Sequence, residues 1–165
     1  MTVTRQDGDQ CSYVIGEDRL ARLLGSSADA WLGLNRVHRE LTRRLEAALD
    51  QEYGLSLSAL EVLGRLAASE QHRRRLSRLA IDVDLSVSRV SRIVDSLQRR
   101  GLVERRPFPG DTRATNACLT DAGLALAREA QTSHLDEVQR LFFDRLSEDE
   151  LRTLAHVFAR LLNGS

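Results

Sequence analysis

Two short helical segments separated by a three-residue turn lie in the middle of the chain and constrain its fold most strongly. The second segment is predicted to begin at Ser86, a residue type favoured as a helix N-cap, and to end near Arg100, before the left-handed stop of Gly101. The first is predicted from Ser77 to about Val83, with its apolar residues at helical spacing: Leu76, Leu79, Ala80 and Val83. Such an arrangement is typical of a helix-turn-helix unit.

A predicted β-hairpin follows this unit directly. Residues 102–106 and 113–119 have the composition of strands, and residues 107–112 between them contain both prolines of the chain together with Gly110. In a helix-turn-helix with an attached hairpin, the second helix enters the major groove of duplex DNA while the hairpin, or wing, straddles the backbone. The central segment therefore predicts a winged helix-turn-helix that binds double-stranded DNA.

Further helices are predicted on both sides of the winged unit. An apolar stripe predicts one long helix from Ser27 to about Asp50, and Ser58 with Glu61 forms a capping box for the next helix. After the hairpin, Thr120 is expected to cap a helix that reaches about Leu141. Two further helix-start signals, Ser147 and Glu150, precede a last amphipathic segment. The fold class is mainly α with a small β wing.

We expect the flanking helices to form a dimerisation layer around the winged helix-turn-helix core. The apolar residues of these helices exceed what one core of this size needs: Trp31, Val37, Leu41, Phe142, Leu154, Phe158 and Leu161. The domain organisation is thus an extension of unassigned function (1–26), a dimerisation helix (27–56), the DNA-binding domain (57–119) and C-terminal dimerisation helices (120–165). A homodimer should bind a pseudo-palindromic operator.

The charge of the chain is distributed unevenly although its net charge is zero. Residues 73–113 contain 11 arginines and five acidic residues, a net charge of +6, whereas the remainder contains 13 arginines and 19 acidic residues, a net charge of −6. A nucleic-acid footprint needs only one basic face, so the basic centre agrees with DNA binding. All 24 residues of the Lys and Arg class are arginine, whose planar guanidinium suits phosphates and guanine edges. A GC-rich genome explains the absence of lysine at least as well.

The candidate DNA-contacting residues lie mainly on the second helix of the pair. Its apolar positions 90, 93, 94 and 97 form the buried face, which leaves Ser88, Arg89 and Arg92 outward as candidates for reading base edges. A solvated polar face is the more common explanation for an isolated helix, and the attached wing favours the DNA contact here. The full predicted contact set is Arg75, Ser77, Ser86, Ser88, Arg89, Ser91, Arg92 and Arg113.

The central run contains a series of short motifs in a fixed order: Leu79-Ala80, Ser86, the V-S-R-I-V-D-S-L segment at residues 90–97, and G-L-V-E-R-R, D-T-R and L-T-D-A-G after it. In the order and spacing of these motifs it resembles the winged-helix core of the MarR family of transcriptional regulators. The resemblance can be followed from about Ser27 to Leu162. It implies that Asp111 orients Arg113, which reaches into the minor groove, and a charge-assisted pair two residues apart is mechanically reasonable.

This sequence departs from the family pattern in two places. Asp84 occupies the turn position where the family often has glycine, and Asp tolerates the left-handed conformation better than most residues. The segment before Ser27 extends beyond the start of many relatives, and its function is left open.

The resemblance also implies a pocket for a small phenolic or aromatic ligand between the dimerisation helices and the DNA-binding lobe. Trp31 and His38 on the long helix are the candidate lining residues, with Arg39 or Arg65 to meet an anion. Core packing is the competing explanation for Trp31 and His38. The family relationship and the basic centre together favour a regulator, most simply a repressor that a ligand releases from DNA.

Enzymatic, metal and membrane functions lack sequence support. The two cysteines, Cys11 and Cys118, have no metal-binding spacing, the four histidines are scattered, and no Gly-rich phosphate loop or nucleophile motif occurs. We therefore expect a cytoplasmic protein without a cofactor or metal and without membrane contact. Two alternatives stay open: a redox-responsive regulator that uses Cys11, and an architectural protein that binds DNA without sequence preference.

Overall fold

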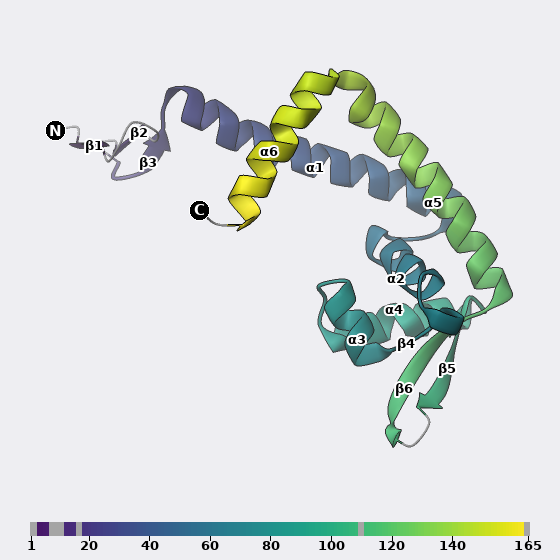
Figure 1. Cartoon of the computed structure of the whole chain (residues 1–165). Helices are drawn as coiled ribbons and strands as arrows, with labels where there is room; N and C mark the ends of the chain where they lie inside the picture. The colour runs from purple at the N-terminus through teal and green to yellow at the C-terminus, as the bar shows by residue number, and fades with distance from the viewer. Residues whose placement is uncertain (1–2, 7–11, 16–17, 109–110, 164–165) are drawn as a thin grey trace. The chain divides into compact units, whose positions relative to one another are not determined.

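The computed structural model describes residues 3–6, 12–15, 18–108 and 111–163, and the chain forms two compact units, residues 1–44 and residues 45–165. The first unit contains strands β1 (Val3–Gln6), β2 (Ser12–Ile15) and β3 (Ala21–Leu23). They form an antiparallel sheet in the order β1-β2-β3 (Figure 1). Helix α1 (Gly25–Tyr53) begins in this unit and ends in the second, close to its predicted bounds.

The small N-terminal sheet was not expected from the sequence. Its strands are three or four residues long, which is too short to show a clear alternation of apolar and polar residues. A turn at Asp18 and Arg19 lies immediately before β3. Pairing places Tyr13 opposite Leu23 and Ile15 opposite Ala21, so these four side chains share one face of β2 and β3.

The second unit carries the predicted winged helix-turn-helix. Helices α2 (Leu57–Ala67), α3 (Leu76–Asp82) and α4 (Val87–Arg99) precede the hairpin of β5 (Val103–Phe108) and β6 (Asp111–Leu119). Helices α5 (Asp121–Leu141) and α6 (Glu148–Asn163) follow. Short 3-10 turns lie at Glu70–His72 and Phe143–Arg145. Figure 1 shows the hairpin projecting away from the helices α2, α3 and α4. The predicted fold class is confirmed.

The predicted start of α2 was wrong. Ser56, not Ser58, is the N-cap: its hydroxyl accepts a hydrogen bond from the amide of Ala59 at 3.1 Å. Leu55 just before it is 1% exposed, so burial of that side chain fixes where the chain enters the helix. The S-x-x-E pattern of Ser58 and Glu61 therefore lies inside the first turns of the helix.

The core of this unit lies where α2, α3, α4 and the wing sheet meet. Six valine and leucine side chains of these three helices are completely inaccessible to solvent: Val62, Leu63, Leu66, Leu79, Val90 and Val94. Leu79, Val90 and Val94 are positions that helical spacing predicted to be buried. Burial of each such side chain contributes about 1.5–3 kcal/mol relative to exposure, which is what fixes the two helices of the pair against each other.

The turn between α3 and α4 forms as expected with Asp84 in place of glycine. Asp84 adopts φ +50°, in the left-handed region, and Gly101 after α4 adopts φ +71°. The Ser86 hydroxyl accepts a hydrogen bond from the amide of Arg89 at 3.3 Å, which confirms Ser86 as the N-cap of α4. The orientation of α4 is thus defined at both ends.

The wing is a three-stranded sheet rather than a hairpin alone. The basic run Arg73–Arg75 forms strand β4, which pairs with β6, and the strand order is β4-β6-β5. Strand β5 extends to Phe108 and so includes Pro107, which was expected in the loop. An outer strand tolerates a proline because one of its edges needs no donor. Strand β4 was not predicted, because a run of three arginines has no strand pattern in the sequence.

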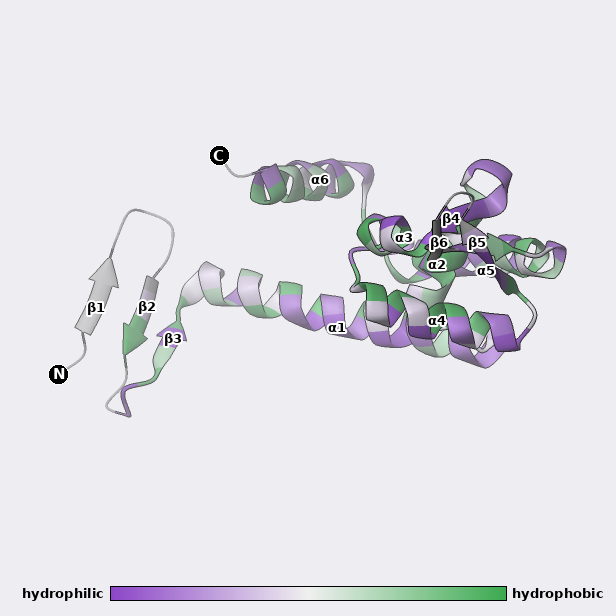
Figure 2. Cartoon of the chain, turned by 90° about the horizontal axis from the view of Figure 1, so that it is seen from below, coloured by the Kyte–Doolittle hydropathy of each residue, from purple (hydrophilic) through white to green (hydrophobic). Residues whose placement is uncertain are grey.

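Helices α5 and α6 begin at the predicted caps. The Thr120 hydroxyl accepts a hydrogen bond from the amide of Gly123 at 3.0 Å. Glu150 accepts from the amide of Ser147 at 2.8 Å, while the Ser147 hydroxyl accepts from the amide of Glu150 at 3.4 Å. Figure 2 shows α6 with hydrophobic residues gathered along part of its surface. Among the described residues, no helix has the length and apolar character needed to cross a membrane.

Candidate nucleic-acid interface

The outer face of α4 presents the residues proposed to read bases. Ser88, Arg89 and Arg92 are exposed, whereas Val90 and Val94 on the opposite face are fully buried. Within the described part of the chain, no ion pair or side-chain hydrogen bond engages the guanidinium group of Arg89 or Arg92. Both cations are therefore available to an external anion or hydrogen-bond acceptor.

Three further residues of the predicted contact set, Arg75, Ser77 and Ser86, lie at the start of α3 or of α4. Ser77 is exposed at the second position of α3, and Ser86 is exposed as the cap of α4, with its hydroxyl 3.1 Å from that of Ser88. Arg75 is half-buried in β4, opposite Asn116 of β6. Its side chain thus lies at the junction between the wing sheet and α3, rather than on the outer face of α4.

Ser91 occupies an internal position in the unit. It is half-buried, and its hydroxyl accepts a hydrogen bond from Nη2 of Arg105 at 2.9 Å. The same nitrogen donates to the Ser91 carbonyl at 3.1 Å and to the Asp95 carboxylate at 2.7 Å. Arg105 lies in β5, so these contacts join the wing to α4. Sequence reasoning did not assign Arg105 a role.

A second arginine joins the opposite edge of the wing sheet to α3. Nε of Arg74 in β4 lies 2.7 Å from Oδ2 of Asp82 at the end of α3. The hydrogen bond from Arg74 lowers the pKa of the Asp82 carboxyl below its usual value. Each outer strand of the sheet is therefore connected to one helix of the helix-turn-helix by a charge-assisted hydrogen bond.

The predicted wing pair lies beyond what the structure describes in detail. Asp111 and Arg113 belong to β6, which places both at the tip half of the wing. Their side chains lie outside the described residues, so the orienting contact between them stays a prediction.

A cavity of about 500 Å³ borders α4 on the side of the α1–α2 connection. Its rim includes Arg89, Arg92 and Arg100, and apolar residues including Leu55, Ile93 and Leu97 line its floor. Arg100 is held in place, since its guanidinium donates to the carbonyl of Gly54 at 2.8 Å and of Tyr53 at 2.7 Å. This contact joins the end of α4 to the end of α1 within the second unit.

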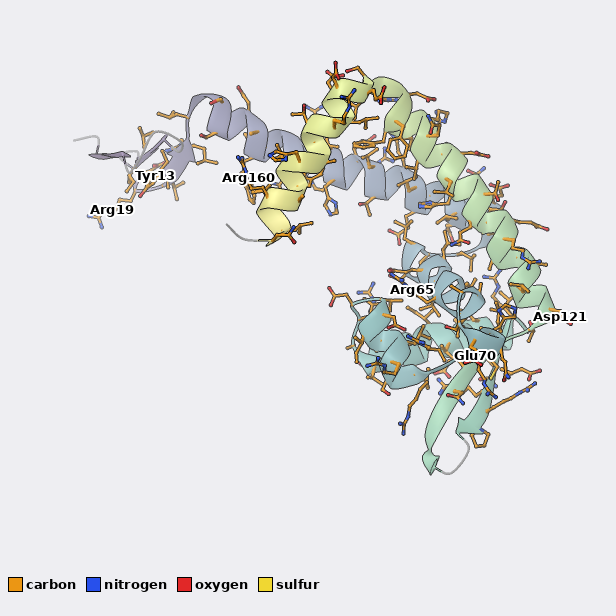
Figure 3. All side chains as sticks on the ribbon, in the orientation of Figure 1. Tyr13, Arg19, Arg65, Glu70, Asp121 and Arg160 are labelled. Atoms are coloured by element: carbon orange, nitrogen blue, oxygen red, sulfur yellow. The ribbon has the colours of Figure 1, made fainter. Side chains whose placement is uncertain are left out.

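The proposed ligand residues are all exposed in the chain. Trp31, 57% exposed, lies on α1 with His38 and Arg39 in the first unit. Arg39 borders a surface cavity of about 450 Å³, together with Arg36, Glu40, Arg43 and Arg44. Arg65 projects from α2 in the second unit (Figure 3). Because Trp31 is exposed, it does not pack in the core of a single chain. Ligand binding by these residues stays a prediction.

The cysteines and metal-binding residue types offer no further site in the described residues. Cys118 is 8% exposed in β6, and burial raises the pKa of its thiol, which disfavours the reactive thiolate. Cys11 lies outside the described residues. The described part of the chain contains no group of three or more His, Cys, Asp or Glu residues arranged to hold a metal ion.

Comparison with known proteins establishes the family. The MarR family sequence profile matches residues 53–114. An uncharacterised HTH-type transcriptional regulator of Bacillus subtilis, YdgJ, is 31% identical over 87% of this chain and 84% of its own. The chain therefore belongs to the MarR family and is a transcriptional regulator rather than an enzyme.

Solved structures agree with this assignment. AbsC, a MarR family regulator from Streptomyces coelicolor, is 34% identical with a TM-score of 0.75, over 87% of this chain and 99% of AbsC. Sco3205, a MarR family regulator from the same organism solved in complex with DNA, is 28% identical with a TM-score of 0.78, over 87% of this chain and 90% of Sco3205.

Proposed function

We propose that this regulator is a sequence-specific DNA-binding protein, most simply a repressor, which uses α4 as its recognition helix. The observation that carries the proposal is the exposed pair Arg89 and Arg92, which have no ion-pair partner among the described contacts. They lie on the outer face of a helix whose opposite face is buried at Val90, Val94 and Leu97. Arginine forms bidentate hydrogen bonds with guanine, the commonest specific contact in the major groove. The similar Sco3205 was solved in complex with DNA, which supports DNA binding by this chain.

The wing and the neighbouring serines supply the contacts that position the protein. In this proposal Arg113 enters the minor groove beside the site that α4 reads, with Asp111 holding its guanidinium. Ser77, Ser86 and Arg75 face the sugar-phosphate backbone, where such contacts fix register without carrying sequence information. Repression then follows from occupancy, since a protein bound over promoter DNA excludes other proteins from it.

A second copy of the chain completes the DNA-binding unit in this proposal. Exposed apolar side chains among the described residues support a dimer: Trp31, Leu34 and Val37 on α1, and Phe158, Leu161 and Leu162 on α6. Exposed apolar residues gathered on helices mark association surfaces. Sedimentation at micromolar concentration tests the dimer directly, and a monomer there would contradict it.

Selection of bound sequences from random duplex DNA tests the proposed function. We expect a pseudo-palindromic consensus whose half-sites are about one helical turn, roughly 10 base pairs, apart, because a symmetric dimer presents two recognition helices. Enrichment of no sequence over the starting pool would instead favour an architectural protein that binds DNA through phosphates alone.

A small aromatic or phenolic ligand is proposed to control DNA binding by favouring a dimer with misplaced recognition helices. The two helices must lie about 34 Å apart to meet successive major grooves, so a ligand needs only to bind the misplaced form more tightly. Trp31, His38, Arg39 and Arg65 are the proposed contacts. The test is a thermal-shift screen of aromatic acids, phenols and urate, followed by DNA competition. Failure of every compound to stabilise the protein and to weaken DNA binding would contradict the proposal.

A further inference from the structure

The connection between Arg105 and α4 has features that surface ion pairs lack. Arg105 is 25% exposed, and one nitrogen, Nη2, contacts three oxygen atoms on two successive turns of α4, those of Ser91 and Asp95. Its Nε is buried and has no hydrogen-bond partner within the described residues. An unsatisfied buried donor costs free energy, so the Nη2 contacts must hold the side chain in this place.

The position of these contacts is as informative as their number. Asp95 follows Arg92 by three residues on α4, and Arg105 lies in the outer strand that leads toward the wing tip. The bond from Arg105 therefore connects the two elements that are proposed to enter different grooves of the DNA. Arg89, which lies nearer the start of α4, has no comparable link to the wing among the described contacts.

We propose that Arg105 is a positioning residue that fixes the angle between the recognition helix and the wing through Ser91 and Asp95. The guanidinium contacts the protein rather than DNA, and Ser91 acts through Arg105 rather than by touching a base. This inference rests on the proposed DNA-binding function and adds a residue that determines specificity without reading a base. When α4 and the wing are both correctly placed, they contact the operator at the same time, and the complex is specific.

Substitution of Asp95 distinguishes a positioning role from simple electrostatics, because the two predict opposite changes in the affinity for the operator. Removal of a carboxylate from a DNA-facing helix reduces repulsion of phosphates, so electrostatics alone predicts tighter binding for Asp95→Ala. Positioning predicts weaker binding to the selected operator, by roughly tenfold, a factor equivalent to about 1.4 kcal/mol. Asp84→Asn is the matched control. It removes an exposed carboxylate from the nearby turn, has no ion partner among the described contacts, and retains a residue that tolerates positive φ.

Arg105→Lys separates positioning from loss of charge and from loss of folding. Lysine keeps the positive charge but cannot reproduce the multiple contacts of the guanidinium group. We expect the variant to bind unrelated duplex DNA as the wild type does, because that binding depends on phosphates. Its preference for the selected operator over unrelated DNA should fall roughly tenfold. A partly unfolded variant would lose affinity for both duplexes in equal proportion.

The measurement is the dissociation constant of the full chain for the selected operator and for an unrelated duplex, at one salt concentration. Tighter operator binding by Asp95→Ala, or undiminished preference in Arg105→Lys, would overturn the positioning role. Equal affinity of the wild type for both duplexes would instead refute the proposed sequence-specific function itself, and with it the inference that rests on it.

Discussion

Gly123 at the start of α5 packs directly against the backbone of Leu102: a Cβ atom added to Gly123 would lie 2.0 Å from the Leu102 carbonyl oxygen. That oxygen accepts a hydrogen bond from the amide of Thr120 at 3.1 Å, so it cannot move aside freely. We predict that Gly123→Ala lowers the free energy of unfolding by about 3 kcal/mol, the upper end of the usual cost of overpacking. Denaturant titration measures the change.

Gly33 provides the control for this prediction. It lies within α1, and a Cβ atom added there meets nothing within 4 Å. Gly33→Ala should therefore raise the free energy of unfolding by about 0.5–1 kcal/mol, because alanine restricts the unfolded chain and favours the helix. If both substitutions had the same effect, close packing at Gly123 would not explain the glycine of the L-T-D-A-G motif.

Arg89 and Arg92 should contribute to both affinity and base preference. We expect Arg89→Ala or Arg92→Ala to weaken operator binding by about 1–3 kcal/mol and to relax the preference at one position of each half-site. Titration of the operator and of its single-base variants measures both effects. Arg128→Ala, which removes an exposed arginine of α5, is the control for charge alone. If the substitutions weakened binding equally on every DNA sequence, the two arginines would contact phosphates rather than bases.

The wing pair should show unequal effects on DNA binding. Arg113→Ala removes the proposed minor-groove contact, while Asp111→Ala removes only the group proposed to orient it. We therefore expect Asp111→Ala to reproduce part of the loss measured for Arg113→Ala. The double variant should bind about as weakly as Arg113→Ala alone, since the two residues act in series. Wild-type affinity of Asp111→Ala in a DNA titration would contradict the pairing.

His134 should make the folded protein sensitive to mild acid. Burial lowers the pKa of His134 below its usual value of 6.5, and its Nδ1 is buried without a hydrogen-bond partner among the described residues. The unfolded chain therefore binds the proton more tightly. Stability is retained above about pH 6.5 and lost as the pH falls toward the folded pKa.

Denaturant titrations at pH 7.5 and 5.5 test this expectation. The decrease in the free energy of unfolding between the two pH values should be smaller in His134→Leu than in the wild type. The same substitution at the exposed His156 is the control. An equal decrease in wild type and His134→Leu would exclude His134 as the source of acid sensitivity.

The parts of the fold that could be predicted from sequence are those with local signals. Ser86, Thr120 and Ser147 are helix caps as predicted, and the buried positions of α4 follow directly from helical periodicity. The start of α2 was misplaced because two serines, Ser56 and Ser58, compete for the cap and the burial of Leu55 decides between them. Tertiary packing therefore set a boundary that local patterns left ambiguous.

The parts that were missed depend on pairing between distant residues. Strand β4 is a strand only because β6 lies beside it, and its own sequence of three arginines carries no such signal. Arg105 was likewise overlooked, because its partner Asp95 lies ten residues away on a different element. Periodicity identified which side chains of α4 are exposed, whereas the contact between α4 and the wing required coordinates.

Competition between the selected operator and a scrambled duplex of the same length and composition tests the central claim most directly. We predict that the wild-type protein prefers the operator by about a thousandfold or more, a ratio typical of specific DNA-binding proteins. We also predict that Arg89→Ala with Arg92→Ala reduces this ratio sharply. Equal competition by the two duplexes would contradict sequence-specific recognition by α4.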